Sequence, residues 1–169
     1  PNNGLATYEG KTLAIANNAA YVGDALIRVN WMPLNVTDPA APVATSTIVP
    51  IFSNFEKWSD GTLDRFVHGG KVVDEIAFQA SGGSALTLSH DGEKLGISVA
   101  DAQVEVVYTD GTSIAGPITA STFMGKFVGS SGDGPLGVLG TWSVPGFSGA
   151  NALTGSFGAD LTSFETLLP

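Results

Sequence analysis

Apolar and polar residues alternate along much of this chain, in short segments that glycine and proline separate. Alternation with a period of two is typical of a β-strand, because successive side chains of a strand point to opposite faces. Helical periodicity is hard to find, although residues 11–22 fit either interpretation and the tail 161–169 is compatible with one helical turn. Nine segments are predicted strands: 7–16, 24–32, 44–52, 71–80, 84–89, 102–109, 121–129, 136–144 and 151–161.

Turn-forming residues stand between several of these strands. Gly-Gly and Asp-Gly pairs favour tight hairpins, because these residues tolerate a positive φ. Two longer segments, the proline-rich 32–50 and residues 53–70, are expected to be irregular loops. Eight or nine short strands joined in this way predict an antiparallel sandwich or barrel. The Gly-Gly and Asp-Gly pairs are found at 60–61, 69–70, 82–83, 91–92, 110–111 and 133–134.

Three predicted strands place a glycine beside an aromatic residue on one face. Alternate residues read Phe-Gly-Phe-Gly over 123–129, Val-Gly-Trp-Val over 138–144 and Leu-Gly-Phe over 153–157. A small closed barrel needs this mixture, because its large interior side chains need small neighbours and its bent strands favour glycine. A flat glycine-rich strand used for assembly is the alternative. We therefore expect an all-β fold, a small antiparallel eight-stranded β-barrel with long irregular loops, formed by residues 1–169 as a single domain.

The same strands resemble a known protein family. Residues 123–129 (FMGKFVG), 134–144 (GPLGVLGTWSV) and 153–161 (LTGSFGADL) are similar to the end of the eight-stranded barrels of transferrin-binding protein B and related bacterial surface proteins. Residues 8–10 (YEG) are similar to the opening strand of that family. The chain departs from the family at 127–130, where FVGS stands in place of Phe-Tyr-Gly-Pro. The resemblance implies the barrel fold and a bacterial surface or secreted protein, and it transfers no ligand-binding residue.

Composition narrows the possible partners. Only 14% of the 169 residues are charged, against about 25% in an average protein, and the net charge is −9. Nucleic acids and anionic membrane surfaces are excluded as partners, since both are bound by basic residues. The apolar runs are too short for membrane insertion, and cysteine is absent. The chain starts at Pro1, so we expect a processed or excised piece of a larger protein that is extracellular or on a bacterial cell surface.

The sequence holds no convincing constellation for catalysis or metal binding. His68 and His90 are the only histidines, and each precedes a turn, so we expect exposed turn residues and no metal site. Asp74 and Glu75 are the nearest approach to the carboxylate pair of a glycoside hydrolase, but nothing in the sequence brings a second carboxylate to them. No Gly-x-Ser-x-Gly elbow occurs, and the loop 129–134 lacks the lysine of a phosphate-binding loop. We predict that the protein is not an enzyme and has no cofactor.

Aromatic residues in or near the two irregular segments are the candidate binding residues. Aromatic side chains on loops that a rigid barrel holds are typical of recognition sites. Capping of one barrel end is the structural alternative for each of them. The predicted partner-binding residues are Trp31, Phe52, Phe55, Trp58 and Phe66.

Three functions remain open from the sequence. The first is a non-enzymatic interaction module whose loops bind another protein. The second is a structural, self-assembling subunit or terminal domain of an extracellular filament or layer. The third is a carrier of haem or another small ligand in the barrel mouth. Haem ligands for the third would come from the two histidines and from Tyr8, Tyr21, Met32, Tyr108 and Met124.

Overall fold

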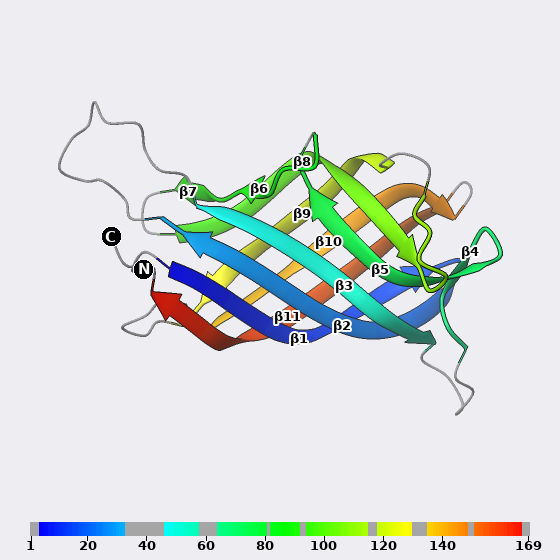
Figure 1. The fold of residues 1–169 in the computed structure, drawn as a ribbon, viewed down its shortest axis with the longest axis horizontal. Coiled ribbons are helices and arrows are strands. Elements are labelled where there is room, and N and C mark those ends of the chain that lie inside the picture. The colour runs from blue at the N-terminus through cyan, green and yellow to red at the C-terminus, as the bar shows by residue number, and fades with distance from the viewer. Residues whose placement is uncertain are drawn as a thin grey trace.

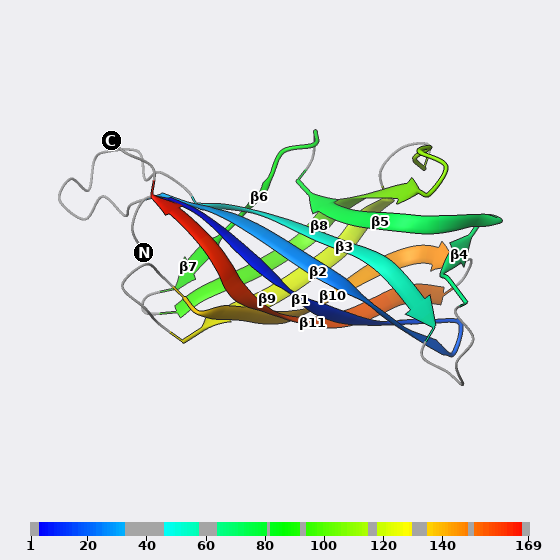
Figure 2. The ribbon, with the colours of Figure 1, turned by 60° about the horizontal axis from the view of Figure 1, so that its bottom comes forward.

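The chain folds into a closed antiparallel β-barrel of eight strands, as predicted. In the computed structural model, strands pair in the order β5-β3-β2-β1-β11-β10-β9-β8, and β8 returns to β5 (Figure 1). The strands cross the barrel at a steep tilt, which closing a small barrel requires (Figure 2). The structure describes residues 4–32, 46–57, 64–80, 82–91, 94–114, 118–129, 135–148 and 151–166.

These residues form eleven strands and no helix. The barrel strands are β1 (Gly4–Ala16), β2 (Ala19–Trp31), β3 (Thr47–Lys57), β5 (Lys71–Gln79), β8 (Lys94–Tyr108), β9 (Ile118–Val128), β10 (Gly137–Ser148) and β11 (Asn151–Thr166). Three short strands complete the sheet: β4 (Val67–His68), β6 (Leu86–Thr87) and β7 (Ser89–Asp91).

The first hairpin and the last strand settle the two ambiguous segments. Asn17 and Asn18 have φ values of 49° and 62°, as the two central residues of a type I′ turn require, so residues 11–22 are strand and turn. The chain beyond residue 161 continues as strand to Thr166, because β11 pairs with β1 as far as Gly4. The helical turn considered for this tail does not form in the described residues.

The prediction of an irregular segment over 53–70 was partly wrong. Residues 53–57 belong to β3, which carries a bulge opposite Gly23 at Asn54, whose φ is 54°. The bulge adds one residue to β3, so the alternation of faces shifts by one position there. As a result Phe52 and Phe55 both point inward, although an even and an odd position of a regular strand face opposite sides. A strict alternation of faces cannot detect this arrangement.

The barrel closes along a seam of few hydrogen-bonded pairs. Strand β5 pairs with β3 at residues 51–53 only, and β6 takes over at Thr47 and Ile48. Pro50 lies between these two contacts. Proline has no N–H group to donate, so it suits a position where β3 changes from one neighbour to the other.

Aromatic side chains pack over glycines inside the barrel. Trp142 is the cross-strand partner of Gly155, and Phe157 is the partner of Gly140. A methyl group at Gly155 would lie 2.3 Å from the indole of Trp142, and one at Gly140 would lie 2.7 Å from the ring of Phe157. The predicted pairing of glycines with aromatic residues is confirmed, and its physical reason is the space that each ring occupies.

We expect the change Gly155→Ala to lower the free energy of unfolding by about 1–3 kcal/mol, because the added methyl overpacks the core against Trp142. Gly158→Ala is the matched control, three residues along the same strand, where an added methyl meets nothing within 4 Å. Urea denaturation of both variants measures the difference. Equal stabilities would show that the indole does not need this space.

Candidate functional site

The structure places the predicted partner-binding aromatics inside the barrel. Trp31, Phe52, Phe55 and Phe66 are each at most 3% exposed. These four side chains therefore belong to the core in this structure, and none presents a recognition surface. Trp58 lies outside the described residues.

Phe52 is the centre of the core. Its ring lies 5.1 Å from that of Trp142 in a stacked arrangement, and 5.5 Å from that of Phe157. Phe78 and Phe123 complete its surroundings, with ring centroids at 6.0 and 6.3 Å. The indole N–H of Trp142 donates to the hydroxyl of Thr12 at 3.1 Å, so the polar atom of this cluster is satisfied. Side chains from six strands thus fill the space in which a barrel-type carrier would hold its ligand.

A second aromatic group fills the end of the barrel where β1 begins. Trp31 meets Phe127 edge-on at 4.9 Å, and Tyr8 lies 5.7 Å from the same ring. The Tyr8 hydroxyl donates to the carbonyl of Pro135 at 3.2 Å. Burial raises the pKa of Tyr8 to about 12, and the nearby Trp31 indole acts in the opposite direction. That indole N–H does not complete a hydrogen bond of normal geometry and is buried without a partner.

An aromatic cap closes the opposite end. Phe66 stacks on Phe147 with ring centroids 5.5 Å apart, and His68 stacks on Phe147 with ring centroids 4.4 Å apart. Nδ1 of His68 and the hydroxyl of Tyr108 share a hydrogen bond of 2.8 Å. The expectation of an exposed turn histidine therefore does not hold for His68, whose ring is part of the cap. Among the described residues, no group of three or more His, Cys, Asp or Glu is placed to hold a metal ion.

The structure brings together carboxylates that the sequence did not connect. Glu75 on β5 lies near Glu105 on β8 as well as its neighbour Asp74, with Ala77 directly opposite Glu105. Partial burial and these two charges raise the pKa of Glu75, while Arg28 lowers it. Only the cross-strand register reveals this grouping, because the three residues are up to 31 positions apart.

The outer face of five adjacent strands carries a charge-free surface, which we call the uncharged wall. Two neighbouring rows run across β2, β1, β11, β10 and β9, and paired positions follow one another without a gap. The first row is Val22, Leu13, Ser156, Thr141 and Met124, and the second is Ala20, Ile15, Thr154, Ser143 and Thr122. None of these ten residues is ionisable, although the whole chain carries a net charge of −9.

Large apolar side chains project from the uncharged wall. Leu13 is 43% exposed, and Ile15 and Met124 are about half exposed at 51% and 50%. Two hollows adjoin along this wall, one of about 500 Å³ beside Leu13 and Val22, and one of about 340 Å³ between Ile15 and Met124. An exposed apolar surface that contains hollows is typical of a protein-binding site.

Charged residues border the uncharged wall on two sides, because Glu56 on β3 is the partner of Val22 at the end of the first row and the next row holds an ion pair. Lys11 forms an ion pair with Asp24 there, and the Asn54 amide donates to the second oxygen of Asp24 at 2.8 Å. These two hydrogen bonds lower the pKa of Asp24. The edge along that row is therefore a neutralised ion pair, whereas the edge at β3 carries the Glu56 carboxylate.

The uncharged wall is not evident from the sequence, because its residues look like ordinary solvent-facing positions. Within each strand they read as isolated Leu, Met, Thr or Ser residues, and single exposed apolar residues are common. The signal lies in the absence of Lys, Asp and Glu at alternate positions of residues 13–22, 122–124, 141–143 and 154–156. It becomes visible once the strand order is known.

No family model, curated protein or solved structure matches this chain. The similarity to transferrin-binding protein B barrels therefore stays a prediction, while the eight-stranded barrel stands on the structure. In the described parts of the chain, no helix is long and apolar enough to cross a membrane.

Replacing Phe52 by alanine is expected to lower the free energy of unfolding by about 3–5 kcal/mol, because it empties the centre of the aromatic core. Val67→Ala, at a residue 53% exposed on β4, is the control and is expected to change stability by less than about 0.5 kcal/mol. Thermal and urea unfolding measure both. A Phe52→Ala variant as stable as the control would restore Phe52 as a candidate surface residue.

Stability is expected to fall as the pH rises from about 10 to about 12, because the unfolded chain releases the Tyr8 proton before the folded chain does. Below the pKa of Tyr8 in the unfolded chain, the neutral Tyr8 makes its full contribution to the free energy of unfolding, which is on the order of 2 kcal/mol. Urea midpoints measured from pH 9 upward test it against Tyr8→Phe, which has no proton to release. An identical decline in both proteins would show that other groups cause it.

Proposed function

We propose that this chain is a non-enzymatic, extracellular or cell-surface interaction module that binds another protein on the uncharged wall. The observation that carries the proposal is the pair of charge-free rows across five strands, with Leu13, Ile15 and Met124 projecting from them. A partner that covers this surface removes apolar area from water and leaves no buried charge unpaired.

The filled interior supports the same function. Because aromatic rings occupy the core and the cap, the described hollows that border the uncharged wall open outward. Binding on the outside suits a barrel whose hydrogen-bonded strands hold their outward side chains in fixed positions. The predicted loops 32–50 and 53–70 are not needed for this proposal, since their described aromatics face the core.

Self-assembly is a second candidate, and the same surface favours it. Two copies with a net charge of −9 each repel one another wherever their carboxylates meet. The uncharged wall is a surface on which two copies can meet without that repulsion. The partner is then a second copy of the chain, and the assembled form is concentration-dependent.

The double change Leu13→Glu with Met124→Glu is expected to weaken binding at least about tenfold, because it places two carboxylates against an apolar partner surface. Val67→Glu adds a carboxylate at an exposed residue outside the uncharged wall and is expected to leave binding unchanged. Each variant is first checked for a native-like NMR spectrum.

The measurement has two parts. Sedimentation velocity over a range of concentrations detects self-association, and quantitative affinity capture from the source cells detects a different partner. A species bound by the wild type and by Val67→Glu but lost by the double variant supports the proposal. Equal binding by the double variant would move the interface elsewhere.

A further inference from the structure

The larger hollow of the uncharged wall is open at a position where β11 carries no side chain. Gly158 is exposed there, and a methyl group added to it would meet nothing within 4 Å. Its cross-strand partners are Lys11 on β1 and Leu139 on β10. The hollow of about 500 Å³ extends from Gly158 over β1 to β2, with Leu13 projecting beside it. This volume lies within the range of about 300–1,000 Å³ that is typical of ligand pockets.

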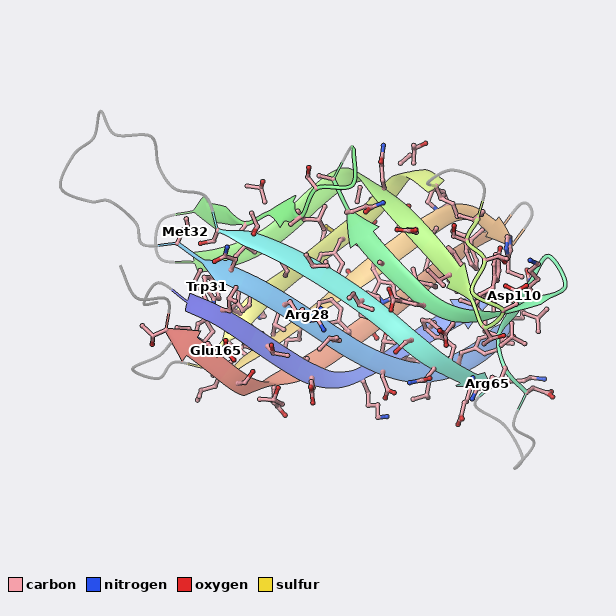
Figure 3. The ribbon with its side chains drawn as sticks, viewed as in Figure 1. Arg28, Trp31, Met32, Arg65, Asp110 and Glu165 are labelled. Atoms are coloured by element: carbon pink, nitrogen blue, oxygen red, sulfur yellow. The ribbon has the colours of Figure 1, made fainter. Side chains whose placement is uncertain are left out.

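The floor of the hollow is the outer side of the aromatic core. Phe157 lines the hollow from β11, and its ring lies 5.5 Å from that of Phe52 inside the barrel. Val22 lines it from β2 and pairs with Glu56, which bridges to Arg65 near the capped end of the barrel (Figure 3). Core packing and strand pairing therefore hold the shape of the hollow, and a preformed hollow costs an occupant little ordering.

Two polar side chains at the hollow already have partners within the chain. The ammonium of Lys11 pairs with Asp24, so the apolar stem of Lys11 is the part that suits the lining. The hydroxyl of Thr12 donates to the carbonyl of Ser156 at 2.9 Å and accepts from the indole of Trp142. An apolar occupant therefore leaves neither group without a partner.

We propose that this hollow is the anchor point of the uncharged wall and receives one large apolar side chain, of Leu, Met or an aromatic residue, from the bound protein. The inference rests on the proposed function. Protein interfaces concentrate their affinity in a few large side chains that fill pockets. Leu13 and Ser156 line both this hollow and the second hollow of the wall, so a protein that inserts a side chain here covers the wall in the same contact.

The first test is an NMR titration of the isotope-labelled chain with N-acetyl-L-phenylalaninamide, an uncharged probe that carries one aromatic side chain. We expect saturable shifts of the amides of Leu13, Val22, Ser156 and Gly158, with a dissociation constant in the millimolar range. N-acetylglycinamide has the same backbone and no side chain. It is expected to bind at least about tenfold more weakly, because it buries no apolar area in the hollow.

The change Gly158→Leu fills the hollow and leaves the wall uncharged. It is expected to weaken probe binding at least about tenfold, with Gly158→Ala intermediate, and to keep the fold because the added Cβ has room. Ser163→Leu is the matched control, since it adds the same side chain to an exposed residue of β11 outside the uncharged wall. This control is expected to bind the probe normally.

The same variants are then tested for binding of the species that the wild type binds in the sedimentation or capture measurements. A loss of at least about tenfold by Gly158→Leu supports the anchor, because this variant adds apolar area and removes only the hollow. If Gly158→Leu binds normally while Leu13→Glu with Met124→Glu does not, the anchor is overturned and the uncharged wall stands as the interface. Absence of saturable probe shifts at tens of millimolar would also overturn the anchor. Probe binding by a chain that binds no protein would overturn both proposals, in favour of a free apolar small molecule.

Discussion

The packing of large aromatic rings into a narrow closed barrel is the constraint on which the rest of this structure depends. Phe52 and Trp142 stack at the centre, and their space exists because glycine stands where a neighbouring side chain would collide. The same demand explains the bulge in β3, which turns Phe55 inward as well as Phe52. Once the interior is full, the chain has only its outer face and its two ends for recognition.

The uncharged wall is assembled across strands rather than along them. The uncharged wall takes two residues from each of five strands. A rigid barrel holds such rows in register because each position is fixed by hydrogen bonds to both neighbouring strands.

Strand positions, the closed barrel and the pairing of glycine with aromatic residues could be predicted from the sequence, because alternation and turn residues are local signals. The locations of Phe55 and Phe66 could not, since a bulge and an end cap break the alternation that assigns a face. The uncharged wall could not be predicted from the sequence either. Leu13 and Met124 are 111 positions apart, and only the order of β1, β11, β10 and β9 brings them onto one wall.

The pairing of the first strand with the last determines how the barrel bears a load. Gly4 at the start of β1 is the direct partner of Thr166 near the end of β11, so both ends of the folded chain leave from the same edge. A pull on the two ends acts across these strands and separates their hydrogen bonds one after another, as in a zipper. Shear, which would strain the whole ladder at once, is not engaged. When the two ends are pulled apart, the barrel is therefore loaded in its weak direction. When one end is pulled against a partner bound on the uncharged wall, the β1–β11 pair is not the first to open.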